Sequence, residues 1–209
     1  MRLKGVAAAP RPWARHLSEH QLRRLWFAGL SFTRIYRRLV LLERPLTQSF
    51  SDVSAHASMR VSLLAETEVA AYMAFRPDQD AANIRLRLEH AHRCFAVWHE
   101  QQIIHAAWAA TARARIEYLS RELPLAPDEV YVYDAFTAPA FRGRGASPLR
   151  ALTLGEHSRA QGYRRLLTAV HPENRVGFRP LEKVGTRPVG VIGYVGLGRW
   201  RWQFCRRRG

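Results

Sequence analysis

One short stretch of the sequence has the residues of an anion-binding turn. Residues 135–150 read AFTAPAFRGRGASPLR, with Gly143 and Gly145 beside Arg142 and Arg144. The stretch follows an apolar run and precedes a helical pattern, so the glycines fall where a helix begins. The first backbone N–H groups of a helix have no internal partner, and glycine lets a phosphate approach them. We expect a phosphate-binding turn, with a surface turn of an arginine-rich protein as the alternative.

The turn differs from two common nucleotide-binding motifs. A P-loop ends in Gly-Lys-Ser or Gly-Lys-Thr, and no such triplet follows the glycines here. A dinucleotide-binding fingerprint requires a third glycine, which is missing as well. The spacing therefore favours another kind of phosphorylated ligand.

Three side chains in the preceding apolar run could take part in proton transfer. Asp134 is the one carboxylate in VYVYDAFT, residues 130–137, and Tyr131 and Tyr133 share the opposite face of the expected strand. A buried carboxylate without a partner is costly, so Asp134 should either be paired through structural hydrogen bonds or serve the chemistry. It could act as a base or anchor a substrate amine. The two tyrosines either line an acceptor pocket or belong to the core.

The stretch TAPAFRGRGAS resembles motif A of the GNAT acetyltransferase superfamily. In that motif (Q/R)-x-x-G-x-(G/A) follows V-x-P-x-(Y/F), and the signature falls here on Arg142, Gly145 and Ser147, with Pro139 and Phe141 ahead of it. Downstream, HPENRVGFRPLEKVG resembles motif B of the same family, N-x6-(L/Y)-E-K-(L/V)-G. Its matches are Asn174, Glu182, Lys183 and Gly185. The two motifs lie at the distance that the family shows.

The resemblance implies a fold, a donor and a reaction. The fold would be α/β of the α+β type, with a mixed, mostly antiparallel sheet of about six to seven strands and helices on both faces. The donor would be acetyl-CoA, and an acceptor amine would attack the thioester directly in a ternary complex. The strand that ends near residue 137 would offer backbone hydrogen bonds to pantetheine, and the turn after it would hold the pyrophosphate.

Carried onto this chain, the family pattern assigns two sets of residues. Asp134 falls where many relatives carry Glu or Asp, with Tyr131 and Tyr133 as further catalytic candidates. The residues expected to bind the cofactor are Phe136, Thr137, Arg142, Gly143, Arg144, Gly145, Ala146, Ser147 and Asn174. No metal ligand set is expected.

Three residues depart from the family pattern. Leu181 stands where many relatives have the tyrosine that protonates the leaving thiolate, Thr186 replaces the usual aromatic residue, and Ser147 replaces Gly or Ala. The first change leaves the acid role to water or to another tyrosine, such as Tyr194. It also leaves open a protein that binds acyl-CoA without acetylating anything.

The expected elements fall into two regions. Residues 1–58 read as an N-terminal arm with a basic amphipathic helix over about 19–42 and a linker. Residues 59–209 read as the acetyltransferase domain, in the order strand, two helices, three strands, helix, strand, helix and a last hairpin. A short helical piece and a loop are expected over 112–128, and a helix over 174–184. The N-terminal helix packs on the domain, mediates a homodimer or binds an acidic surface.

The charge of the chain favours anionic partners. The formal net charge is +16, and 31 of the 33 basic residues are arginine, a bias that codon usage in a GC-rich bacterial genome also produces. Two alternatives to acetyl transfer follow: a longer acyl donor on CoA or on an acidic acyl carrier protein, and a non-catalytic nucleic-acid binder. Arginines in the expected substrate loops favour an anionic acceptor; they are Arg85, Arg87, Arg93, Arg113 and Arg115.

The remaining features concern the compartment. Cys94 and Cys205 are far apart in sequence and form no CxxC pair, which favours a reduced, cytoplasmic protein. The apolar patch VAAA near the start is too short for a signal peptide, and no window is long and apolar enough to span a membrane.

Overall fold

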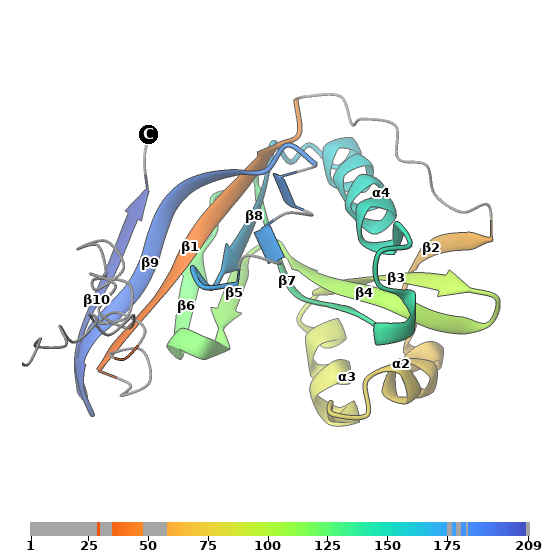
Figure 1. The fold of residues 1–209 in the computed structure, drawn as a ribbon, viewed down its shortest axis with the longest axis horizontal. Coiled ribbons are helices and arrows are strands. Elements are labelled where there is room, and N and C mark those ends of the chain that lie inside the picture. Colours follow the sequence, from red (N-terminus) through yellow and green to blue (C-terminus); the bar gives the residue numbers. More distant parts are fainter. Residues whose placement is uncertain are drawn as a thin grey trace, which may run out of the picture.

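The protein is described by a computed structural model that covers residues 29, 35–47, 58–174, 177–178, 181–182 and 184–207. One eight-stranded sheet runs through it, in the order β10-β9-β1-β8-β7-β4-β3-β2 (Figure 1). The strands are β1 (Tyr36–Pro45), β2 (Met59–Leu63), β3 (Arg93–His99), β4 (Gln102–Ala110), β7 (Glu129–Thr137), β8 (Arg165–Val170), β9 (Arg187–Leu197) and β10 (Trp200–Arg207). A separate hairpin consists of β5 (Arg113–Ile116) and β6 (Arg121–Pro124).

Among the strands of the described residues, only one neighbouring pair in the large sheet is parallel. β7 and β8 run parallel, and every other neighbouring pair is antiparallel. The helix between them, α4 (Ala146–Ala160), provides the crossover that a parallel pair requires. The expected mixed, mostly antiparallel sheet is therefore confirmed, with eight strands in place of six to seven.

Helices cover both faces of the β2–β7 half of the sheet. Successive side chains of β4 point to opposite faces, so Ala107 packs in a core with Leu154 of α4, while Trp108 packs with Tyr72 and Ile84. The latter two belong to α2 (Val69–Phe75) and α3 (Ala81–Glu89), which lie across the sheet from α4 in Figure 1. The described part of the chain also contains the short 3-10 turns Glu66–Glu68, Glu117–Leu119 and Pro139–Phe141.

The predicted N-terminal helix is wrong for its last residues. Tyr36–Pro45 is the inner strand β1, which pairs with β8 on one side and β9 on the other. The apolar run Leu39–Leu42 fits a helix face, but it equally fits a strand that is buried on both faces, and pairing with two strands satisfies its backbone. The remaining residues of the predicted helix lie outside the described residues, except Gly29 and Ile35.

The stretch 112–128 also differs from expectation. It forms the β5–β6 hairpin, joined by the 3-10 turn Glu117–Leu119, where a short helical piece and a loop were expected. Leu119 and Leu123 pack against Leu41 of β1 and Ile192 of β9, so the hairpin covers the other half of the sheet. Of the helix predicted over 174–184, the described residues 177–178 and 181–182 are helical, and the described end residues 174 and 184 are not. No helix in the described part of the chain is long and apolar enough to cross a membrane.

Candidate functional site

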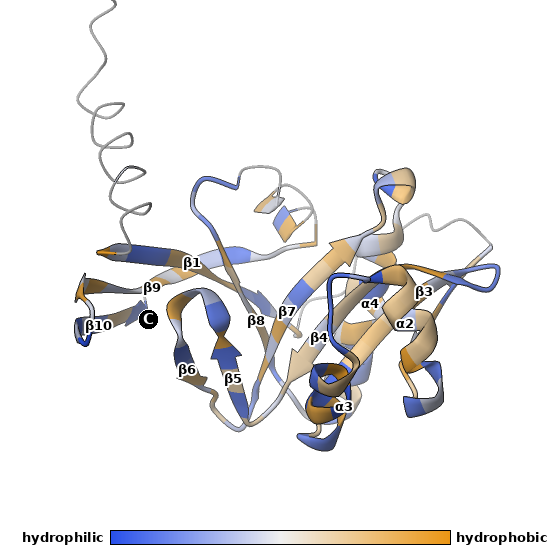
Figure 2. Cartoon of the chain, turned by 90° about the horizontal axis from the view of Figure 1, so that it is seen from below, coloured by the Kyte–Doolittle hydropathy of each residue, from blue (hydrophilic) through white to orange (hydrophobic). Residues whose placement is uncertain are grey.

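A cleft opens where β7 and β8 separate. The two strands pair only over Glu129–Tyr131 and Arg165–Leu167, and beyond these residues they diverge, as Figure 2 shows. The cleft has a volume of about 1950 Å³ and is lined by both strands, the turn before α4, the β5–β6 hairpin and residues of α3. The edge of β7 that faces β8 therefore borders open space, in which an extended ligand can take backbone hydrogen bonds.

A β-bulge interrupts β7 in the middle of this cleft. Ala106 of β4 pairs with Phe136 and Trp108 pairs with Tyr133, so Asp134 and Ala135 together face the single residue Ala107. Asp134 has a φ of +50°, a left-handed conformation that asparagine and aspartate tolerate better than most residues. The bulge changes the direction of the β7 backbone at the place where β7 and β8 have separated. Bulges of this kind recur at functional sites.

The glycine turn has the expected geometry. Gly145 is the N-cap of α4 with a φ of +85°, and Gly143 has a φ of +78°. A Cβ on Gly143 would meet no atom within 4 Å, so the positive φ is what favours glycine there. Residues 145–148 at the start of α4 line the cleft, and the first N–H groups of a helix have no partner within it. Charge and geometry together suit a phosphate.

The cleft brings together most of the residues predicted to bind the cofactor. All of them except Arg144 line it, whereas the Arg144 guanidinium lies 5.3 Å from the centre of the Phe141 ring. The Asn174 side-chain oxygen accepts a hydrogen bond of 3.0 Å from the Gly177 N–H, which holds the side chain at the cleft. Leu181 and Thr186, two of the departures from the family pattern, also line it. Tyr194 is buried in the core beside β1 and is absent from the lining.

Asp134 lies between two arginines that approach from α2 and α3. Its Oδ1 accepts from Arg76 Nη1 at 3.1 Å, and its Oδ2 accepts from Arg87 Nη1 at 2.7 Å. Arg76 also forms a two-pronged ion pair with Asp78, through contacts of 2.9 Å each. The hydrogen bond with Asp78, followed by the attraction of Asp134, raises the pKa of Arg76 above its usual value. We call these four residues the Asp134 cluster; their formal charges sum to zero.

Tyr133 forms a short hydrogen bond that the sequence did not reveal. Its hydroxyl lies 2.6 Å from Nδ1 of His92, and both residues line the cleft. Burial, and after it the charge of Arg87, lowers the pKa of His92, so the imidazole is neutral at pH 7 and its Nδ1 can accept a hydrogen bond from the hydroxyl in one of its two tautomers. Tyr131 stacks on Tyr133 with the ring centres 5.9 Å apart and is almost fully buried. Nothing in the sequence distinguishes His92 from the other histidines of its arginine-rich stretch.

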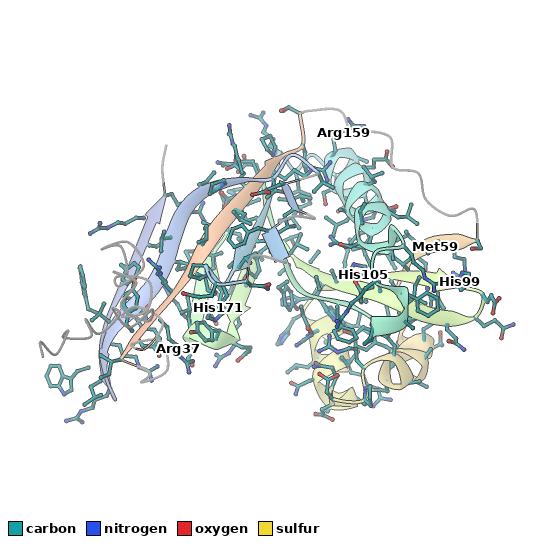
Figure 3. The ribbon with its side chains drawn as sticks, viewed as in Figure 1. Arg37, Met59, His99, His105, Arg159 and His171 are labelled. Carbon is teal, nitrogen blue, oxygen red and sulfur yellow. The ribbon has the colours of Figure 1, made fainter. Side chains whose placement is uncertain are left out.

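A second set of polar residues lies on the α4 face of β7. His105 of β4, labelled in Figure 3 beside the start of α4, lies with Nδ1 2.7 Å from Thr137 Oγ1. Its Nε2 accepts from Arg150 Nε at 3.3 Å, which leaves Nδ1–H to donate to Thr137. Arg44 of β1 is a second buried guanidinium that lines the same part of the cleft. We call Arg44, His105 and Arg150 the Arg150 cluster; the sequence carries no signal for it.

The part of the cleft that is lined by α3 and β5 also carries arginines, and we call it the basic wall. Three of the five arginines expected to favour an anionic acceptor line it, namely Arg87, Arg113 and Arg115. Arg115 is paired with Glu117 at 3.0 Å. Arg85 and Arg93 do not line the cleft, and Arg93 instead bonds to His157 of α4 at 2.9 Å. Among the described residues no group of three or more His, Cys, Asp or Glu side chains could hold a metal ion.

Comparison with known proteins identifies the fold. No family model and no curated protein matches the sequence. Among solved structures, an acetyltransferase from the GNAT family of Novosphingobium aromaticivorans matches at 21% identity and a TM-score of 0.53. The match covers 76% of this chain and 62% of that one, so this chain spans less than two thirds of that protein.

Two further structures have the same architecture. The aminoglycoside N-acetyltransferase AAC(6')-Iy, solved with CoA, matches at 17% identity and a TM-score of 0.50, over 72% of this chain and all of that one. The glucosamine N-acetyltransferase region of a fungal multi-domain β-N-acetylglucosaminidase matches at 13% identity and a TM-score of 0.55, over 90% of this chain and 24% of that one.

Proposed function

We propose that this chain, which has the fold of the GNAT acetyltransferases, transfers an acyl group from coenzyme A to an amine. The observation that carries the proposal is the cleft between β7 and β8, with a glycine turn at its mouth and a bulge at its centre. The mouth suits a phosphate, the open β7 edge suits an extended chain, and the bulge lies where a thioester carbonyl would be reached. Acetyl-CoA is the simplest donor, and AAC(6')-Iy was solved with CoA.

The residues of the turn fit the phosphates of this donor. Arg142 and the backbone from Gly143 to Ser147 surround the start of α4, where helix N–H groups and a guanidinium both favour a pyrophosphate. Along β7, Phe136 and Thr137 would bond pantetheine through their main chains, and Asn174 would contact it from the far side. The donor supplies an activated acyl thioester; the residues described next move the protons.

Tyr133 and His92 provide a route for the amine proton. An attacking amine must lose a proton, and an acceptor within hydrogen-bonding distance is required. The amine proton would pass to the Tyr133 oxygen while the Tyr133 proton passes to Nδ1 of neutral His92, 2.6 Å away. The imidazolium could return that proton to the departing thiolate. This relay would fill the role left open by Leu181.

Asp134 has a different part in this scheme. Both of its oxygens accept hydrogen bonds from guanidinium groups. We therefore propose that Asp134 fixes the positions of Arg76 and Arg87, and that Arg87 in turn positions Tyr133. The Arg87 guanidinium lies 5.4 Å from the centre of the Tyr133 ring. A backbone N–H near the bulge would stabilise the oxyanion of the tetrahedral intermediate.

The acceptor would be an amine that carries a carboxylate or phosphate group. Arg113 lies on the basic wall of the cleft and has no ion pair with a described residue. Asp134, the carboxylate at the centre of the cleft, is already paired with Arg76 and Arg87. This wall repels polycations and attracts anions. Cys94 and Cys205 are free thiols, which supports our proposal of a reducing, cytoplasmic compartment.

Binding of CoA tests the proposal most directly. At 100 times its dissociation constant, acetyl-CoA should raise the free energy of unfolding by about 2.7 kcal/mol, measured by thermal or urea unfolding. Gly145→Glu should abolish that gain, because it places a carboxylate at the phosphate site and forces a side chain into a φ of +85°. Ala82→Glu, which adds the same charge on exposed α3, should retain it. No stabilisation by any acyl-CoA would refute the proposal.

A further inference from the structure

Two tryptophans are exposed on the edge strand at the end of the sheet that lies away from α4. This strand is β10, which pairs with β9 among the described strands and lies at the left of Figure 1. Trp200 is 78% exposed, Trp202 is 70% exposed, and Leu197, opposite Trp200 in the register, is 69% exposed. Single apolar residues on a surface are common, but neighbouring ones that expose this much area mark a site that binds a partner.

The strand register places these rings on one face of the sheet. Trp202 of β10, Val195 of β9 and Tyr36 of β1 lie directly opposite one another, so their side chains point to the same side. Trp200 and Phe204 are two residues from Trp202 along β10 and therefore point that way as well. The β5–β6 hairpin covers the other side of these strands, because the core residues of β1 and β9 pack against its leucines. We call the surface of these five residues the aromatic face.

The rings of the aromatic face meet across β9. Phe204 of β10 and Tyr36 of β1 stack with their ring centres 6.3 Å apart, although β9 lies between their strands. Gly193 of β9 makes this possible, because a Cβ there would lie 2.8 Å from Phe204 Cζ. The aromatic face is therefore one continuous surface over three strands, and its Trp200 and Trp202 side chains stay open to solvent.

The same end of the molecule is strongly basic. Residues 183–209 contain six arginines and one lysine but no aspartate or glutamate. Arg206 shares the aromatic face with Phe204, and Arg199 lies in the turn that joins β9 to β10. Both arginines are exposed, and neither makes an ion pair with a described residue. A second copy of the face would bring the same charges against it and be repelled, whereas a polyanion would be attracted.

We propose that the aromatic face binds single-stranded nucleic acid, with bases stacked on its rings and phosphates held by Arg199 and Arg206. The inference goes beyond acyl transfer and does not rest on it. Several folds hold single strands in this way, with aromatic side chains on an open sheet face for the bases and basic residues for the backbone. Rings two residues apart on a strand stand about 7 Å apart, so Trp200 and Trp202 can each take a separate base. A duplex keeps its bases stacked inside and could not use these rings.

Oligonucleotide binding tests the inference with the full chain. By fluorescence anisotropy, labelled oligouridylate and oligothymidylate of about 12 nucleotides should both bind, since this length is within the site size of common single-strand binding folds. A duplex of the same length should bind more weakly. Trp202→Ala should weaken binding of the single strands at least about 10-fold, which is the usual contribution of one stacked base. Leu63→Ala removes an exposed apolar side chain from β2, the opposite edge of the sheet, and should leave binding unchanged.

Salt dependence tests the phosphate contacts. Arg206→Gln should weaken binding of the single strands and reduce the slope of log affinity against log salt concentration by about 0.7, the value for one lost phosphate contact. Arg85→Gln removes the same charge from an exposed position on α3, outside the cleft, and should keep the wild-type slope. An equal change in both variants would mean that net charge alone governs binding, and the inference would be wrong.

Three other results would also overturn the inference. Unchanged affinity in both Trp200→Ala and Trp202→Ala would exclude stacking on the aromatic face. Binding to vesicles of phosphatidylcholine and phosphatidylserine without binding to oligonucleotides would make the face a lipid contact. Self-association in sedimentation experiments that Trp202→Ala abolishes, again without oligonucleotide binding, would make it an interface between two copies of the chain.

A last control separates the aromatic face from the glycine turn. Nucleotides carry phosphates, so an oligonucleotide could also occupy the start of α4. Gly145→Glu should leave oligonucleotide binding intact, and Trp202→Ala should leave stabilisation by acetyl-CoA intact. Loss of oligonucleotide binding in Gly145→Glu would place the nucleic acid in the cleft and refute the inference. Oligonucleotide binding at the aromatic face without any stabilisation by acyl-CoA would support the inference and refute acyl transfer alone.

Discussion

Two arginine clusters lie on opposite faces of β7, and they balance their charges differently. In the Asp134 cluster, Arg76 and Arg87 meet two carboxylates at distances of 2.7 to 3.1 Å. In the Arg150 cluster, the hydrogen bond of Arg150 goes to a neutral imidazole. Asp134 and Arg87 of the first cluster line the same cleft as the second cluster. In the first cluster each guanidinium contacts a carboxylate, whereas Arg150 in the second has no ion pair with a carboxylate of a described residue.

The difference predicts different effects of mutations on stability. Removal of one member of a balanced buried pair leaves the other charge uncompensated, which strongly destabilises a protein. Replacement of a buried charge that lacks a countercharge by an apolar group can be neutral or stabilising. Mutations in the two clusters should therefore change stability in opposite directions.

The largest effect is expected for Asp134→Asn. Asparagine tolerates the φ of +50° as well as aspartate does, so the substitution removes the charge and little else. Because Arg76 and Arg87 then lose their shared countercharge, the free energy of unfolding should fall by about 3 kcal/mol, measured by urea unfolding. Arg150→Met is the matched substitution on the other face, and it should cause no loss. Equal destabilisation by both variants would contradict the distinction between the clusters.

A somewhat smaller effect in free energy is expected on turnover when the proton relay from Tyr133 to His92 is broken. Tyr133→Phe should lower kcat about 100-fold with little change in the KM for the acyl donor, as removal of a proton-transfer group does. The wild-type kcat should decline as the pH falls through the pKa of His92, which burial and Arg87 hold below 6.5. Tyr133→Phe should flatten that decline, because His92 then no longer receives the proton.

Tyr163→Phe, which removes a hydroxyl next to the core beneath α4, serves as the control for this experiment. It should leave both kcat and its pH profile unchanged. A Tyr133→Phe enzyme with the wild-type pH profile would exclude the relay even if its kcat were low, since loss of packing alone would not alter the profile.

The smallest expected effect concerns acid stability and the Arg150 cluster. The pKa of His105 is about 3 in the folded protein and about 6.5 when unfolded, so the unfolded chain binds more protons below pH 6.5. Its contribution to stability is complete above pH 6.5 and is lost as the pH falls toward 3. Between pH 6.5 and 5 the loss should be about 2 kcal/mol. In His105→Gln, the free energy of unfolding in urea should fall between pH 6.5 and 5 by about 2 kcal/mol less than in the wild type. The same fall in both proteins would mean that His105 is not held neutral.

Much of the fold follows from local patterns in the sequence. The strands β2, β3, β4, β7, β8, β9 and β10 and the helices α2, α3 and α4 all fall where periodicity and turn residues predict them. The glycine turn likewise lies between a strand and a helix, because Gly143 and Gly145 adopt the positive φ that few other residues accept. Such features depend on neighbours in the chain, and the sequence shows those neighbours directly.

The strand β1 shows where local patterns fail. Its run Leu39–Leu42 is apolar at every position, so a helix face and a doubly buried strand explain it equally well. The choice depends on β8 and β9, whose residues lie more than 100 positions later in the chain. The hairpin at 113–124 is similar, since its buried leucines pack against β1 and β9.

The sequence by itself determined the glycine turn, the strand that leads into it, the excess of positive charge and the resemblance to a CoA site. Only the tertiary structure decided how the charged side chains pair. Asp134 meets Arg76 across 58 residues, Tyr133 meets His92 across 41, and Arg150 meets His105 across 45. Electrostatic pairing acts through space and leaves no periodic trace in the chain. Two arginines that look alike in the sequence can therefore contact a carboxylate in one case and a neutral imidazole in the other, and only the tertiary structure shows which partner each has.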